Sequence, residues 1–85
     1  MVVIVSKKKK VGDYLTACII QLHENGRVEI EATGGAIEKL VRTVSRLIDI
    51  ISEAKIEDIK FEEVEFEGKK KAKMRVNVVV LSESE

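Results

Sequence analysis

The stretch Val28-Glu29-Ile30-Glu31-Ala32-Thr33-Gly34-Gly35-Ala36-Ile37-Glu38-Lys39-Leu40-Val41 decides the fold. Its first half alternates apolar and acidic residues, which is typical of a strand with one buried face. The glycine pair breaks this alternation, and from Ile37 onward apolar residues recur at helical spacing. The stretch therefore predicts a half-exposed strand over 27–33, a tight turn at the glycines and a helix that begins near Ile37.

The predicted helix has the clearest periodicity in the chain. One stripe contains its apolar residues, which are Ile37, Leu40, Val41, Val44, Leu47, Ile48 and Ile51. Charged residues lie mostly outside this stripe, as in a helix that packs on a core. The end of the helix is richer in isoleucine than a lone surface helix requires, so we expect a partner surface there.

Two further elements are predicted before this stretch. Val2–Val5 is short, apolar and β-branched, which favours a strand buried on both faces. Apolar residues then recur at helical spacing over 11–22, with Asp13 in the N-cap region and Asn25-Gly26 as the stop signal.

Two strands are predicted after it. Residues 59–66 and 74–80 both alternate, and they are joined by a turn at 67–70. The apolar phase slips by one residue at Glu62-Glu63, which predicts a β-bulge. The resulting order of strand, helix, strand, helix, strand, strand predicts an α+β fold, with a single domain over 1–85.

The basic residues are concentrated in two short runs. Nine of the fifteen lie in Lys7-Lys8-Lys9-Lys10 and Lys69-Lys70-Lys71-Ala72-Lys73-Met74-Arg75. The other six oppose fifteen acidic residues, so the rest of the chain carries a formal charge of −9 although the whole chain is neutral. Two cationic patches on an acidic body suit the binding of a polyanion. The alternative is that both runs are solvated loops.

The position of each run bears on this choice. Lysines before a helix do not stabilise it, because the helix dipole already places positive charge there, but they favour a bound phosphate. The second run falls on a two-stranded ribbon, which can contact phosphates on both sides of a nucleic-acid groove or can simply discourage edge-to-edge aggregation. Gly34-Gly35 could let the backbone approach an anion or only permit the tight turn.

Residues for catalysis or metal binding are sparse. His23 is the only histidine and lies near a helix end, and Cys18, the only cysteine, fits an apolar stripe as a core residue in a reducing setting. No nucleophile has an evident base, so we expect no enzyme, no metal and no cofactor. The first apolar run is too short for a signal peptide, and no run approaches a membrane span, so a cytoplasmic protein is expected.

Two segments resemble the Alba family of archaeal chromatin and RNA-binding proteins. Val3-Ile4-Val5-Ser6-Lys7-Lys8-Lys9-Lys10-Val11-Gly12-Asp13-Tyr14 resembles the family's opening, with an aliphatic strand, a paired lysine and a V-x-(N/D)-Y helix start. Residues 28–41 resemble its I-x-(A/G)-x-G-R-A-I-x-K-A-V segment. The resemblance implies a βαβαββ two-layer sandwich with a mixed four-stranded sheet, like the C-terminal domain of translation initiation factor three.

The resemblance also implies partners and site residues. It implies a homodimer, or a heterodimer with a related chain, whose hairpins embrace double-stranded DNA or structured RNA in a nucleoid-associated setting. The family's lysine pair falls on Lys8 and Lys9, and its helix lysine on Lys39. The candidate binding residues are Lys7, Lys8, Lys9, Lys10, Gly34, Gly35, Lys39, Lys69, Lys70, Lys71, Lys73 and Arg75. Candidates for a dimer or dimer-to-dimer interface are Leu47, Ile48 and Ile51.

The chain departs from the family pattern in ways that bear on affinity. Gly35 stands where the family has arginine, Thr33 stands where a basic residue is common, and the hairpin is short. A second hypothesis is therefore a divergent subunit that pairs with a basic relative or serves in a ribonucleoprotein, with weak nucleic-acid binding of its own. The aromatic residues Tyr14, Phe61 and Phe66 are predicted to be core residues, so binding should be largely independent of sequence.

Overall fold

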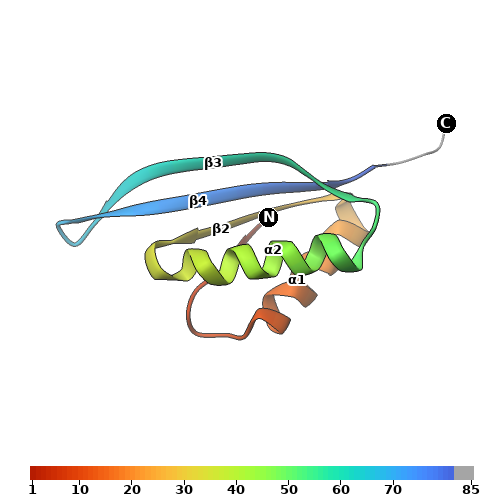
Figure 1. The fold of residues 1–85 in the computed structure, drawn as a ribbon, viewed down its shortest axis with the longest axis horizontal. Coiled ribbons are helices and arrows are strands. Elements are labelled where there is room, and N and C mark those ends of the chain that lie inside the picture. The colour runs from red at the N-terminus through yellow and green to blue at the C-terminus, as the bar shows by residue number, and fades with distance from the viewer. Residues whose placement is uncertain (82–85) are drawn as a thin grey trace.

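The predicted order of elements is confirmed by the computed structural model, which describes residues 1–81. The elements are β1 (Val2–Ile4), α1 (Val11–Asn25), β2 (Arg27–Thr33), the short 3-10 helix η1 (Gly34–Ala36), α2 (Ile37–Ile50), β3 (Ala54–Phe66) and β4 (Lys69–Val80). The strands form one mixed sheet in the order β1-β2-β4-β3, with β1 and β2 parallel. Both helices cover the same face of the sheet, so the fold is an α+β two-layer sandwich (Figure 1).

The core lies between the helices and this covered face. The alternating strand pattern brings one set of side chains inward, and these are Val28, Ile30 and Ala32 from β2 and Met74, Val76 and Val78 from β4. The helices contribute the buried residues Tyr14, Cys18, Leu22, Leu40, Val44 and Leu47. Full burial of each large aliphatic side chain stabilises the fold by about 1.5–3 kcal/mol.

The ends of α1 are fixed by two local interactions. The Lys10 N–H donates to the Asp13 carboxylate at 3.3 Å, so Lys10 is the N-cap and Asp13 is the third helical residue. The prediction of Asp13 in the N-cap region was therefore displaced by three residues, because its side chain reaches back to the cap instead of forming it. Gly26 ends the helix as predicted, with φ of 76° and its N–H donating to the Leu22 carbonyl at 2.9 Å.

The prediction that the first strand is buried on both faces was wrong. β1 is an edge strand, and only the helix side of it is covered. Val3 and Val5 are buried in the core, whereas Ile4 on the opposite face is 63% exposed. A continuously apolar run cannot distinguish these two cases, because the difference depends on how many layers cover the sheet.

The β3–β4 hairpin extends beyond the rest of the sheet. β2 accompanies β4 only as far as the pair Thr33 and Lys73, and residues 63–72 continue as a two-stranded arm, called here the hairpin arm. Glu67 and Gly68 form its turn, with φ of 52° and 78°, as in the turns that suit a two-residue hairpin loop. The arm projects from one end of the molecule (Figure 1), whose longest dimension is 50 Å.

Two predictions for β3 were wrong for one shared reason. The irregularity in pairing lies between Ile56 and Asp58, not at Glu62-Glu63. Phe61 and Phe66, expected in the core, are 68% and 56% exposed. Within residues 1–81, no helix covers the outer part of the hairpin, so its apolar residues need not share one face. The slip in apolar phase at Glu62-Glu63 therefore marks the part of β3 on which no described helix packs, and not a β-bulge.

Among the described residues, no helix is both long enough and apolar enough to cross a membrane.

Cys18 provides a test of the core. Its side chain is buried, and this burial raises the pKa of the Cys18 thiol to about 11. We expect the thiol to be unreactive toward a water-soluble disulfide reagent at pH 8 in the native protein, because both thiolate and access are lacking. In denaturant the same thiol should react fully. Rapid stoichiometric labelling of the native protein would contradict this placement.

Candidate nucleic-acid interface

The four lysines of the first run lie in the connection between β1 and α1. Residues 6–10 form this connection, called here the lysine loop, and all four lysines are exposed. The loop begins where the Val5 N–H donates to the Glu31 carbonyl at 2.9 Å, so its start is fixed to β2. The expectation that the run lies in a loop before a helix is confirmed.

The buried Tyr14 side chain holds the start of the lysine loop. Its hydroxyl donates to the Ser6 carbonyl at 3.1 Å, accepts from the Ser6 N–H at 3.0 Å and lies 2.9 Å from the Ser6 hydroxyl oxygen. Burial raises the pKa of the Tyr14 phenol, but hydrogen bonds from Ser6 and Lys9 and the charge of Lys39 outweigh burial and hold this pKa below its usual value. The phenol therefore lies in a positive, hydrogen-bonded environment.

Lys39 holds the other end of the lysine loop. It lies in the first turns of α2, and its ammonium group donates to the Lys9 carbonyl oxygen. This candidate binding residue is thus half-buried and already has one partner within the chain. Its charge stays beside the loop, while its position orients the backbone that carries the neighbouring lysines.

The glycine pair has two different roles. Gly34 has φ of 62°, a conformation that side-chain-bearing residues rarely adopt. Gly35 has an ordinary φ, but a Cβ atom built on it would lie 2.7 Å from the Lys7 Nζ. A Cβ on Gly34 would lie 3.4 Å from the Lys71 Cδ. Lys7 of the loop therefore approaches Gly35, and Lys71 of the hairpin arm approaches the adjacent Gly34; this glycine pair is called here the glycine turn.

The inner part of the second basic run has a different environment. The Arg75 guanidinium pairs with Glu29 at 2.9 Å and with Glu31 at 3.3 Å. The Lys73 ammonium lies 3.5 Å from Glu31 and 3.9 Å from Glu62. These pairs form on the face of the sheet opposite the helices, called here the open face. Two of the predicted binding residues are thus largely neutralised by carboxylates.

The outer lysines differ from these two. Among residues 1–81, neither Lys7–Lys10 nor Lys69–Lys71 takes part in an ion pair. The hairpin arm is not uniformly cationic, because Glu65 lies opposite Lys70 and Glu63 lies opposite Ala72. In this part of the chain, the highest density of unpaired positive charge is therefore at the lysine loop and the glycine turn, not along the arm.

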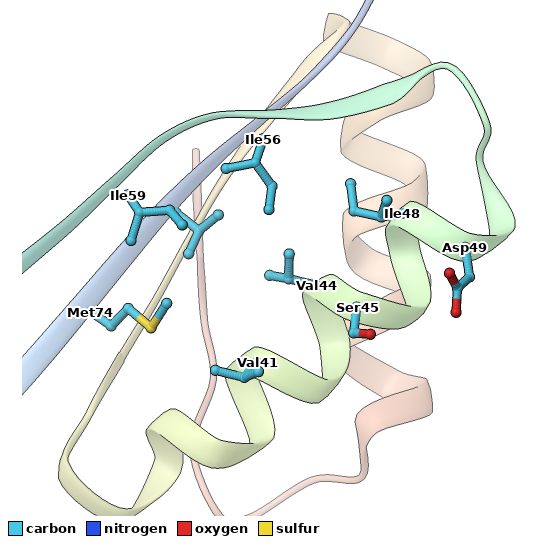
Figure 2. A pocket seen from close by; sticks show the side chains of 9 residues that line it. Val41, Val44, Ser45, Ile48, Asp49, Ile56, Ile59 and Met74 are labelled. Carbon is cyan, nitrogen blue, oxygen red and sulfur yellow. The ribbon is translucent and has the colours of Figure 1, made fainter.

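The three predicted interface residues have three different environments. Leu47 is fully buried in the core, on the inner side of the α2 stripe, and has no exposed surface in the single chain. Ile51 is half-buried beside Ile19 and Val80. Ile48 lines an apolar groove of about 360 Å³ between α2 and β3 (Figure 2).

Sequence reasoning missed most of this groove. Val41, Ile56 and Ile59 point into it from the two sides, and each is close to half exposed (Figure 2). Two features of the sequence indicated this groove. The apolar stripe of α2 is wider than is needed for packing on the core, and β3 carries isoleucines. The groove was not predicted because the position of β3 at the sheet edge follows only from the strand order.

No group of acidic, histidine or cysteine side chains within 1–81 is arranged to hold a metal ion. Buried side-chain polar atoms in the same part of the chain all have hydrogen-bond partners.

Comparisons with known proteins agree with this fold. The model of the Alba family matches residues 1–63, which is most of the chain. The chain belongs to the Alba family. The fold is similar to that of Alba from Thermoplasma volcanium, with a TM-score of 0.80 and 24% sequence identity over 93% of this chain and 99% of that chain. No curated protein sequence matches the chain.

Alba membership indicates a nucleic-acid-binding protein, since members of the family are typically binding proteins and not enzymes. The two segments that resembled Alba proteins are the lysine loop with the start of α1, and β2 with the glycine turn and the start of α2. These two segments are neighbours in space, because Lys39 donates to the Lys9 carbonyl and Lys7 approaches Gly35.

Replacing Tyr14 by Phe tests whether the phenol holds the lysine loop. The change removes the hydrogen bonds to Ser6 and leaves half-buried polar groups of Ser6 without this partner, so the free energy of unfolding should fall by about 1–3 kcal/mol. Urea denaturation measures this change. Thr16→Val is the control, because it removes an exposed hydroxyl from the same helix and should alter stability by less than about 0.5 kcal/mol. Equal stabilities of Tyr14→Phe and wild type would contradict the anchoring role.

Proposed function

We propose that this chain is a dimeric protein that binds double-stranded DNA or structured RNA largely without sequence preference, and that it organises chromatin or RNA. The observation that carries the proposal is the approach of Lys7 and Lys71 to the adjacent glycines of the glycine turn, beside a loop whose other lysines form no ion pair within residues 1–81. Like charges gathered in this way repel each other unless an anion lies among them. A nucleic-acid backbone supplies such anions at regular spacing.

Binding in this proposal proceeds mainly through phosphates. Lysine ammonium groups from the loop and the outer hairpin approach the backbone of the polymer, and the absence of side chains at Gly34 and Gly35 leaves room for the Lys71 and Lys7 side chains beside the turn. Lys39 keeps the loop in place by its bond to the Lys9 carbonyl. Phosphate contacts position a protein on nucleic acid but carry no sequence information, so little base preference is expected.

Dimer formation is proposed to use the apolar groove between α2 and β3. A second copy of this chain is the occupant we favour, because β3 is a long edge strand with unpaired backbone groups and exposed isoleucines, and such an edge is suited to pairing with a copy of itself. A dimer carries two lysine loops, so one complex neutralises about twice as many phosphates. A related chain with a similar edge would give the heterodimer.

One observation favours the second candidate function, a divergent subunit that relies on a basic relative. Carboxylates oppose or flank the lysines of the hairpin arm, at Glu63, Glu65 and Glu67, so the arm attracts a polyanion only weakly. Failure of the purified protein to bind either duplex DNA or structured RNA at low salt, together with binding after a basic partner chain is added, would favour this candidate.

A salt titration tests the proposed binding directly. With about six phosphates neutralised, affinity for duplex DNA should fall on the order of a thousandfold between about 50 and 200 mM salt. Lys8→Ala should weaken binding and reduce the steepness of the logarithmic salt dependence by about 0.9 for each phosphate that is no longer neutralised. Lys55→Ala is the matched control, because Lys55 is equally exposed at the far end of β3. An affinity that barely changes with salt would exclude this mechanism.

Ile59→Asp tests the proposed dimer. Ile59 is 46% exposed in the groove, and a carboxylate there should be tolerated by the monomer but not by an apolar interface. Sedimentation equilibrium should show a dimer for the wild type and a monomer for the variant. Ile20→Asp is the control, since Ile20 is 49% exposed on α1, away from the groove, and should leave the dimer intact. A monomeric wild type would overturn the proposed dimer.

A further inference from the structure

Phe66 is an aromatic residue that is not part of the hydrophobic core. It lies on β3 beside the hairpin turn, paired with Lys69 in the register of the arm, and more than half of its surface is exposed. The alternation of β3 places Phe61 with Met74 on the helix side and Phe66 on the open face. An exposed ring on a charged hairpin costs solvation free energy, and no core contact offsets this cost.

Phe66 borders a hollow on the open face. The hollow has a volume of about 390 Å³ and is lined by Thr33, Val64, Glu65, Phe66, Lys71 and Lys73. This volume falls within the range of roughly 300–1,000 Å³ that small-ligand sites occupy. The hollow thus combines the Phe66 ring, the aliphatic Val64, the Thr33 hydroxyl and the Lys71 ammonium with two further charged residues, Glu65 and Lys73, of which Lys73 is already paired with Glu31 and Glu62.

Lys71 connects this hollow to the glycine turn. Its Nζ lies over one face of the Phe66 ring, 5.5 Å from the centroid, so a base would stack on the other face, and its Cδ lies 3.4 Å from the Cβ position at Gly34. A phosphate held at the glycine turn therefore has the aromatic ring within reach of the nucleotide to which it belongs. Charge beside an aromatic ring is the combination by which proteins bind unpaired nucleotides, since bases stack on the ring while cations hold the backbone.

We propose that Phe66, Lys71 and Thr33 form a stacking site for an unpaired nucleobase, so that the protein binds single-stranded or bulged segments through this hollow in addition to duplex. The inference rests on the proposed function, because it takes phosphate binding at the glycine turn as given. A base within a duplex already stacks on its neighbours and cannot enter the hollow. The ligand class is thus an unpaired nucleotide of either RNA or DNA.

Phe66→Leu tests the site, because it keeps an apolar side chain and removes the aromatic face. Affinities are measured by fluorescence anisotropy for a single-stranded RNA, a DNA strand of the same sequence and the corresponding DNA duplex. The variant should bind single strands on the order of tenfold more weakly and bind duplex unchanged. Weaker binding of both strands identifies any unpaired nucleotide as the ligand, and weaker binding of RNA alone identifies RNA. Phe66→Tyr, which keeps an aromatic ring at this position, should bind as the wild type does.

Phe61→Leu is the matched control, since it removes a ring of similar exposure from the opposite face of the same strand. It should leave all three affinities unchanged. A strand that contains 2-aminopurine gives a second readout: its fluorescence should be quenched by the wild type and not by Phe66→Leu.

Two results would overturn the stacking site while duplex binding persists. One is an unchanged single-strand affinity in Phe66→Leu, and the other is an equal decrease in Phe61→Leu. A wild type that binds none of the three polymers would instead overturn the proposed function, and this inference with it.

Discussion

The reversal of the chain at Gly34 and Gly35 is the constraint on which the remaining geometry depends. Gly34 has a φ that few other residues adopt, and Gly35 leaves room for the end of the Lys7 side chain. Because the turn is this tight, α2 starts directly beside the lysine loop, and Lys39 reaches the Lys9 carbonyl. The same turn meets Lys71 of the hairpin arm. Three segments that are distant in sequence, namely the lysine loop, the glycine turn with the start of α2, and the hairpin arm, thus share one surface.

The charges of the hairpin have separate roles along its length. Near the body, Lys73 and Arg75 pair with carboxylates on the open face, where half-buried ion pairs fix the register of β2, β4 and β3. Ion pairs that remain partly exposed to solvent contribute about 0–1 kcal/mol each, so their main effect is to orient side chains. Beyond the body, Lys69–Lys71 have no such partners in the described part of the chain. The unpaired positive charge of the hairpin is therefore that of Lys69–Lys71, of which Lys71 lies beside the glycine turn.

Much of the fold could be predicted from local sequence patterns. The features that could not be predicted depend on which layers cover the sheet and on the order of its strands. The order of elements, the buried face of β2, the stop at Gly26 and the core position of Cys18 all follow from periodicity and turn chemistry. The exposure of Ile4, Phe61 and Phe66 does not, because periodicity cannot say whether a helix covers a face. The lysine clusters were visible in the sequence, but the pairing of Lys73 and Arg75 with Glu29 and Glu31 requires the register between β2 and β4. The close approach of Lys7 to Gly35 is a tertiary feature with no local signal.

The central claim is that Gly35 matters because it admits the Lys7 ammonium group, and Gly35→Ala tests it most directly. The added Cβ displaces a flexible side-chain end at an ordinary φ, so the melting temperature should not fall. Duplex affinity should decrease, and the logarithmic salt dependence should become less steep by about 0.9, since one phosphate is no longer neutralised. In a Lys7→Ala background the same change should have no further effect, and Gly12→Ala, at an open helical position, should leave binding unchanged. Equal duplex affinities of Gly35→Ala and wild type at every salt concentration would contradict the account.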